Sequence, residues 1–413
     1  MQQHSFRPFF LSALLTLPGV VLRLGGIEVS PPVVALLSGL AILGASFLLT
    51  WACETAQMDI PQAIAVAVVA FIAVLPEYAV DMYFTWMAGK HPESAYSHYA
   101  IANMTGANRL LIGLGWSSLV LVFALRFHTA VTLKEDKRTD VLFLGMATIY
   151  AMFIPIKGSL TWFDAVVFLG IYGWYIWLAS RRPVEESAPE GPAAALAALP
   201  RRRRMAVVYG IFAFSALVIL CNAEPFSESL VATGKMYGID EFLLVQWLAP
   251  IASEAPEFII ALMFAFRGDP GLALGSLLSS KLNQWTLLVG MIPCAYGLSA
   301  GTLAHSIPLD PHQLQEILLT AAQSVFAVVL LLNLRLSLRE AFWLLLLFTA
   351  QLLAPIYETR LEQALGLVRD PLRLHGIFSW IYLTLGCLLL IRNRSHVPQL
   401  LDGFKPAKAE RPC

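Results

Sequence analysis

Two glutamates, each directly after a proline, lie in the middle of long apolar segments: Pro76-Glu77 and Pro256-Glu257. If such a segment crosses a bilayer, an ionised carboxylate near its centre costs at least ~2.5–3.5 kcal/mol, so each glutamate needs a partner, a bound cation or a proton. A proline also removes one backbone donor and obstructs the preceding turn, which leaves carbonyl oxygens available to a cation. The sequence therefore predicts helix breaks at Pro76 and Pro256 and an ion-binding pair at Glu77 and Glu257.

Further oxygen-bearing side chains lie one helical turn from this pair. Asp81 follows Glu77 by four residues and Glu254 precedes Glu257 by three, spacings that place each couple on one helical face. Asp81 fits either the ion site or a solvated outer vestibule. Ser253 lies beside Glu254, and its hydroxyl can ligate a hard cation or relieve a broken helix. We expect Glu254, Ser253 and Asp81 to extend the site.

Each proline-glutamate segment is followed by a segment rich in small residues, and these carry amides, hydroxyls and two cations. Asn103, Asn108 and Ser280 are candidate ligands, although such residues also serve as helix-packing surfaces in membranes. Lys281 shifts its pKa readily when desolvated, so it can neutralise the glutamates, compete with an ion or exchange a proton. Arg109 keeps its proton and is expected to be a fixed counter-charge.

The composition indicates a membrane protein. Of 413 residues, 58% are hydrophobic and 14% charged, whereas soluble proteins carry about 25% charged residues. The net charge is zero, which gives no basic field for nucleic acid. The five cysteines have no metal-ligand or disulfide-framework spacing, and no Cys/His zinc pattern is present.

The apolar residues form blocks long enough to cross a hydrocarbon core of roughly 30 Å as helices. The sequence predicts an all-α polytopic protein of about twelve spans, with small inorganic cations and membrane lipid as its partners. The blocks run at 9–25, 32–55, 61–88, 97–125, 139–155, 161–180, 205–222, 241–266, 271–298, 313–333, 338–356 and 373–392.

Basic residues fall mainly on one side of this arrangement. With twelve spans, nineteen Lys and Arg lie on the side of the N-terminus and seven on the other, and basic loops face the cytoplasm. We therefore expect both termini to be cytoplasmic, in a membrane that the compact loops suggest is the bacterial inner membrane. The polar, Pro/Ala-rich stretch 181–204 is expected to be a cytoplasmic linker between two halves.

The two halves repeat at a spacing of about 180 residues. Residues 58–84 and 239–264 share an acidic start, a long apolar run and a central Pro-Glu. Because these segments form the third and eighth spans, they cross the membrane in opposite directions, as in an inverted repeat of five plus five helices with ion sites at the midplane. The expected divisions are an N-terminal helix (1–31), a first repeat (32–180), the linker (181–204), a second repeat (205–356) and a C-terminal helix with its tail (357–413).

The repeated motifs resemble those of the cation/calcium antiporter superfamily, which contains the sodium/calcium exchangers. Its two inverted repeats carry G-T-S-x-P-E and then G-N-x-x-G-S-N. The first repeat here reads IAVLPE at 72–77 and ANMTGAN at 102–108, and the second reads ASEAPE at 252–257 and GSLLSSK at 275–281.

The resemblance implies that Glu77 and Glu257 are the paired ion ligands, joined by Ser253, Asn103 and Ser280. It implies secondary antiport by alternating access and no cofactor, with calcium, sodium, potassium or protons as the transported ions. The sequence departs from the pattern at 73–74, where Ala-Val brings no hydroxyl, and at Lys281, where the family has a neutral amide. These departures favour a divergent member, coupled to protons or moving a monovalent ion, with calcium still open.

Two other function classes remain compatible with the residues. Paired carboxylates could serve as acid and base in an intramembrane enzyme, although HExxH, GxSxG and metal-spaced histidines are absent from the sequence. The scaffold could also act as a sensor that binds ions without transporting them. We favour an antiporter that is not an enzyme.

Overall fold

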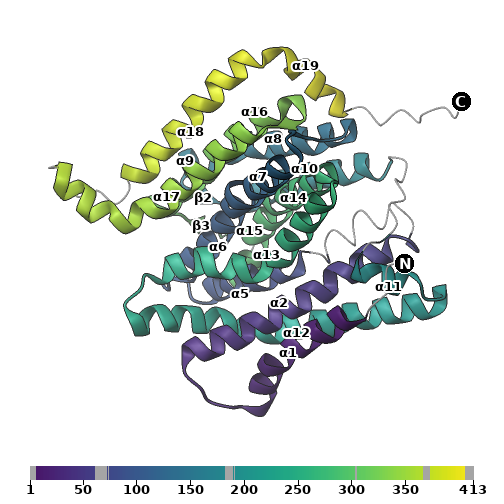
Figure 1. Cartoon of the computed structure of the whole chain (residues 1–413). Helices are drawn as coiled ribbons and strands as arrows, with labels where there is room; N and C mark the ends of the chain where they lie inside the picture. Colours follow the sequence, from purple (N-terminus) through teal and green to yellow (C-terminus); the bar gives the residue numbers. More distant parts are fainter. Residues whose placement is uncertain are drawn as a thin grey trace, which may run out of the picture. The chain divides into compact units, whose positions relative to one another are not determined.

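The computed structural model describes residues 6–60, 72, 74–181, 189, 191–302, 305–365 and 373–404. Helices cover the predicted apolar blocks as far as these residues extend (Figure 1). The first part of the third block (61–71 and 73), part of the linker (182–188 and 190) and the tail 405–413 lie outside the described residues. Within the described part, nine helical stretches are long and apolar enough to span a membrane. The predicted all-α polytopic fold is confirmed.

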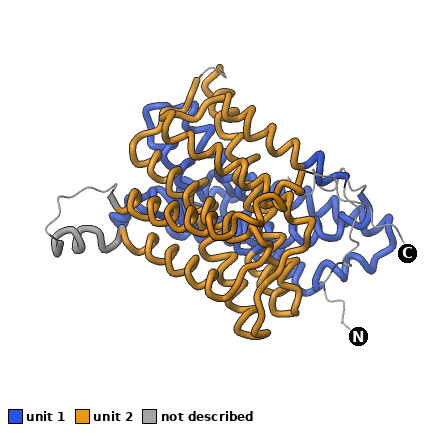
Figure 2. Tube along the Cα trace, turned by 90° about the horizontal axis from the view of Figure 1, so that it is seen from above, with its two compact units in different colours: residues 1–103, 176–257, 406–413 blue, residues 104–175, 258–405 orange. Residues whose placement is uncertain are grey.

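The chain forms two compact units, shown in separate colours in Figure 2. Unit 1 comprises residues 1–103, 176–257 and 406–413. In it, α12 packs along α2, and α1 packs on α2. Phe84, Tyr99 and Phe226 belong to its buried apolar core. Its helices are α1 (Arg7–Gly25), α2 (Pro31–Ala56), α5 (Leu75–Lys90), the start of α6 (Tyr96–Leu110), the end of α10 (Trp162–Ala179), α11 (Pro192–Ala197), α12 (Arg201–Tyr237) and α13 (Glu241–Arg267) as far as residue 257.

Unit 2 comprises residues 104–175 and 258–405, so it holds the end of α6 and all of α14, the two helices that follow the proline-glutamate segments. In it, α16 packs against α18 and α8, and α17 packs against α7. Its further elements are η2 (Leu111–Trp116), α7 (Ser117–Phe127), β1 (Val131–Thr132), η3 (Glu135–Lys137), α8 (Arg138–Ala151), α9 (Ile154–Lys157), β2 (Ser159–Leu160), α14 (Pro270–Asn283), η4 (Gln284–Leu288), α15 (Val289–Ser299), β3 (Ile307–Pro308), α16 (Pro311–Leu330), η5 (Leu331–Asn333), β4 (Arg335–Leu336), α17 (Leu338–Leu365), α18 (Arg373–Arg392), η6 (Arg394–His396), α19 (Val397–Leu400) and η7 (Leu401–Phe404).

Local sequence signals explain where several of these helices begin. Proline occupies the first turn of α2, α5, α14 and α16, where its missing N–H costs nothing. Asp310 caps α16 by accepting a hydrogen bond from the Gln313 backbone, while the Gln313 side chain accepts one from the Asp310 backbone. Asp269 caps α14 with a single bond, which its side chain accepts from the Leu272 backbone N–H. Each cap satisfies donors that the first helical turn leaves without a partner.

Unit 2 contains matched elements from the two sequence repeats. The strand β1 pairs antiparallel with β4, and β2 pairs antiparallel with β3, so each small sheet joins one strand from each repeat. A π-helix follows directly at the end of α6 and another at the end of α14. The compact units thus cut across the repeat boundaries expected from the sequence, which remain a division by sequence.

Candidate functional site

Three of the predicted carboxylates lie together in unit 1. Glu77 is buried in the first turn of α5, where the helix dipole favours negative charge. Its carboxylate interacts electrostatically with those of Glu257 and Glu254, which both lie on α13. Glu254 is fully buried and Glu257 is partly buried. The structure therefore brings the carboxylates of Glu77, Glu257 and Glu254, all three named from the sequence, into electrostatic contact.

Asp81 belongs to the same interior rather than to a solvated vestibule. It is fully buried one turn along α5 from Glu77, and Asn103 Nδ2 donates a hydrogen bond to its Oδ1 at 3.1 Å. Its second oxygen, Oδ2, and Glu77 Oε2 are both buried with no hydrogen-bond partner among the described residues. Buried acceptors normally have partners, so these two oxygens are free to ligate a cation or carry a proton.

The two prolines act differently. Pro76 lies in the first turn of α5, so a helix does begin at this position. The predicted break at Pro256 is wrong, because α13 continues through both Pro250 and Pro256. A proline removes a single backbone donor, and a helix can kink there without ending. Ser253 Oγ donates to the carbonyl oxygens of Ala249 and Pro250, each at 3.3 Å, so its hydroxyl relieves the local backbone.

The remaining predicted ligands lie in unit 2. Lys281 is fully buried on α14, and its ammonium donates to Asn108 Oδ1 at 2.7 Å. The same ammonium lies 4.4 Å from the centre of the Trp285 ring, an arrangement that stabilises a cation. Ser280 is also buried, and its hydroxyl has no hydrogen-bond partner among the described residues. Asn108 and Lys281 are thus in contact within unit 2, and Ser280 directly precedes Lys281 on α14.

Arg109 is a counter-charge, as expected, but its partner is a carboxylate that the sequence reasoning missed. Its guanidinium forms a buried ion pair with Glu316 on α16, 207 residues away. Glu316 also accepts a bond from His375 Nε2 at 2.9 Å. The sequence signal was present but weak, since Glu316 lies early in the tenth apolar block.

A second buried carboxylate, Asp140 on α8, was also missed. Its Oδ2 accepts from Lys137 Nζ at 2.9 Å and from Ser279 Oγ at 2.8 Å. Ser279 directly precedes Ser280 on α14. The Asp140 interaction therefore ties the first-repeat helix α8 to the α14 segment that carries Ser280 and Lys281, just as Glu316 ties α16 to Arg109.

The π-helix η2 begins two residues after Arg109, and the π-helix η4 begins at the residue after Asn283. Such wide turns are rare and often mark functional positions. In η2 the glycines permit close packing: a Cβ on Gly113 would overlap the Phe348 ring, and one on Gly115 would lie 2.8 Å from Phe258 Cε1. The glycines in LIGLGW at 111–116 were the available sequence signal.

A family model described as sodium/calcium exchanger protein matches residues 30–181 and 207–357. The chain belongs to this family. It is therefore an integral, multi-pass membrane protein of the cation/calcium antiporter superfamily, and the resemblance noted in its motifs is confirmed. A comparison with curated proteins gave no significant match.

Several solved structures share the fold. A structure described as an H+/Ca2+ exchanger, CAX, is 42% identical, covers 98% of each chain and superposes with a TM-score of 0.90. The native YfkE structure is 16% identical and covers 84% of this chain and 99% of its own, with a TM-score of 0.60. The sodium-calcium exchanger NCX_Mj, soaked with Na+ and Sr2+, is 18% identical over 77% and 96% of the two chains, with a TM-score of 0.51. At these low identities, YfkE and NCX_Mj show the fold alone.

Proposed function

We propose that this cation antiporter exchanges Ca2+ for protons by alternating access, with both ions bound at Glu77 and Glu257. The observation that carries the proposal is the buried cluster of Glu77, Glu254, Glu257 and Asp81, in which two carboxylate oxygens have no protein partner among the described residues. Carboxylates are the hard oxygen ligands that Ca2+ prefers.

The same cluster supports competition between the two ions. Glu77, Glu254 and Glu257 carry like charges that interact in a low-dielectric interior, so they cannot all be ionised without a compensating cation. Either a divalent cation or protons can supply the missing positive charge. One species must then leave as the other arrives, which is the requirement for antiport at a shared site.

Other oxygens complete the proposed coordination. Ca2+ takes six to eight oxygen ligands in proteins, and the carboxylates of Glu77, Glu257, Glu254 and Asp81 would supply most of them. Asn103 orients Asp81 through its 3.1 Å hydrogen bond. Ser253, Asn108 and Ser280 remain proposed ligands. Lys281 is proposed to modulate transport through its positive charge or by exchanging its proton.

We propose protons rather than sodium as the coupling ion, because the chain shares more sequence with a proton-coupled exchanger than with a sodium-coupled one. The H+/Ca2+ exchanger structure is 42% identical over 98% of this chain, whereas the sodium-calcium exchanger structure is 18% identical. The missing hydroxyls at 73–74 also leave fewer neutral oxygens for sodium. We place both termini in the cytoplasm on the strength of the basic-residue asymmetry.

The test is Ca2+ flux in proteoliposomes driven by either a pH gradient or a Na+ gradient. Wild type should move Ca2+ when a pH gradient is the only driving force. Glu77→Gln and Glu257→Gln should each abolish this flux. Glu93→Gln changes an exposed loop carboxylate and should leave flux intact. Undiminished flux in both site variants would exclude the glutamate pair. Flux driven by Na+ alone would exclude proton coupling, and Ca2+ binding without flux would indicate a sensor.

A further inference from the structure

Two histidines and a glutamate converge at one end of the helix pair α16 and α18 in unit 2, and none of them belongs to the glutamate pair described above. His312 lies in the first turn of α16, Glu316 lies one turn further, and His375 lies in the first turn of α18. One ligand atom from each residue lies within 4.8 Å of the others. Helices α16 and α18 pack side by side in unit 2 (Figure 1).

We propose that His312, Glu316 and His375 form a binding site for a divalent transition-metal ion of the Zn2+ type. Two imidazoles and one carboxylate are the donor set that Zn2+ takes in proteins, with a water as the fourth ligand. Ca2+ prefers oxygen ligands and needs more of them. The site would therefore select a different class of cation from the transported one.

The spacing of the ligands fits this use. His312 and Glu316 are four residues apart on one helix, so both side chains project from the same face, and His375 approaches them from the neighbouring helix. Metal–nitrogen bonds of about 2.0–2.1 Å require ligand atoms a little over 3 Å apart. His375 Nε2 and Glu316 Oε1 are already 2.9 Å apart, so a small outward shift is enough to admit an ion.

Arg109 prepares the carboxylate for such a role. Its guanidinium binds Glu316 Oε2 and so fixes the orientation of Oε1, the oxygen that faces His375. Hydrogen bonds that orient a ligating carboxylate are a regular part of metal sites. The Arg109–Glu316 pair is neutral in sum, and the bound ion's charge would be shared with two neutral imidazoles.

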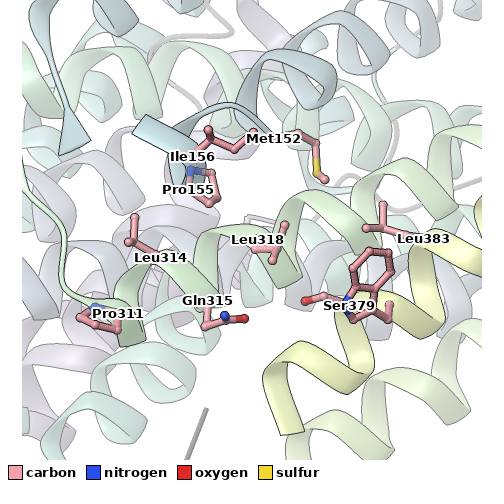
Figure 3. A pocket seen from close by; sticks show the side chains of 10 residues that line it. Met152, Pro155, Ile156, Pro311, Leu314, Gln315, Leu318, Ser379 and Leu383 are labelled. Carbon is pink, nitrogen blue, oxygen red and sulfur yellow. The ribbon is translucent and has the colours of Figure 1, made fainter. Parts of the chain in front are cut away.

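The site is accessible without being exposed. His312 is partly buried, and the His375 side chain is 12% exposed. A pocket of about 460 Å³ lies beside the cluster, lined by Pro311 and Gln315 on α16 and by Ser379 on α18 (Figure 3). Pro311 and Gln315 directly precede His312 and Glu316 on α16.

The proposal is tested by titrating purified, tag-free full chain with Co2+, a spectroscopic substitute for Zn2+, in the presence of excess Ca2+. Wild type should bind one Co2+ with the intense visible bands of a four-coordinate nitrogen and oxygen site, and Zn2+ should displace it. His312→Ala and His375→Ala should each weaken binding by at least about tenfold, the loss seen even for outer-shell partners. His91→Ala, which changes an exposed histidine beyond α5, should bind as wild type does.

Absence of the four-coordinate bands in wild type would overturn the proposal, as would equal Co2+ affinity in wild type and both site variants. If either alanine variant unfolds more easily than wild type without metal, His312→Gln and His375→Gln replace them and must show the same loss. Co2+ bound only at the glutamate pair would give the weak spectrum of an oxygen-coordinated ion and would survive the histidine changes. Failure of this proposal is therefore distinguishable from failure of the proposed exchange.

Discussion

Lys281 donates a hydrogen bond to Asn108 Oδ1 at 2.7 Å, and these two residues occupy corresponding last positions of the two repeated motifs. The second repeat has the cation Lys281 where the family pattern has an amide. The first repeat supplies the amide, Asn108, that accepts the hydrogen bond from this cation, so the two motifs contact each other at this position. The positive charge of Lys281 is held on α14 by Asn108 and by the Trp285 ring.

Replacing Lys281 with Asn should change the pH dependence or ion selectivity of transport. The change removes a buried positive charge from the α14 segment that contains Ser280, so less competition with the transported cation is expected. Flux measured over a series of pH values and cations checks this. Lys235→Asn, at the exposed end of α12, is the matched control. An unaltered profile for Lys281→Asn would show that Lys281 acts in packing alone.

Replacing Asn103 with Ala should weaken Ca2+ binding more than it weakens the fold. Asn103 donates to Asp81 at 3.1 Å, and loss of a hydrogen bond to a charged group costs about 1.5–3 kcal/mol. We expect roughly tenfold or greater loss of Ca2+ affinity, measured by equilibrium binding. Asn222→Ala is the control, because that buried amide bonds the Val218 carbonyl instead. Equal affinity in wild type and Asn103→Ala would remove Asp81 from the proposed site.

Replacing Arg109 with Met should strongly destabilise the protein. The variant leaves Glu316 buried without its guanidinium partner, and breaking one side of a buried pair costs about 3–5 kcal/mol. The double change Arg109→Met with Glu316→Met should recover part of this loss. Thermal unfolding in detergent measures both. A double variant no more stable than Arg109→Met would contradict the pairwise account.

Asp59 and Arg204 should make stability in unit 1 depend on pH. Arg204 donates two hydrogen bonds to Asp59, at 2.6 and 2.8 Å, and these lower the pKa of that carboxyl below its ordinary value. The stabilisation is therefore present above the ordinary Asp pKa and disappears as pH falls through the lowered one. Asp59→Asn should lower the unfolding temperature at neutral pH, and the difference from wild type should shrink under strongly acidic conditions. A difference that is constant with pH would argue against the ion pair.

Replacing Gly113 with Ala should destabilise unit 2 through overpacking. A Cβ at this position overlaps the Phe348 ring on α17, and such excess volume costs about 1–3 kcal/mol of stability. Gly210→Ala is the control, because nothing lies within 4 Å of the added carbon. Phe348→Leu combined with Gly113→Ala should restore part of the unfolding temperature, and failure to do so would point to the π-helix backbone itself.

The sequence alone determined the membrane class, the positions of the apolar helices and the proline-glutamate pairs, because a bilayer imposes length and polarity rules that act along a single segment. Glu77 and Glu257 could be paired in advance because the two repeats carry the same local motif. The same local rules misjudged Pro256, because the loss of one backbone donor does not end α13.

Only the tertiary structure decided which charges meet. Arg109 forms an ion pair with Glu316, Glu316 contacts His375, and Lys281 donates a hydrogen bond to Asn108. In each case the partner lies on a helix distant in sequence. These partners are set by how helices pack and by which polar groups must be satisfied when water is excluded. The sequence of one helix does not specify which other helix packs against it. The buried ion pair and the His312–Glu316–His375 cluster could therefore be identified only from the tertiary structure.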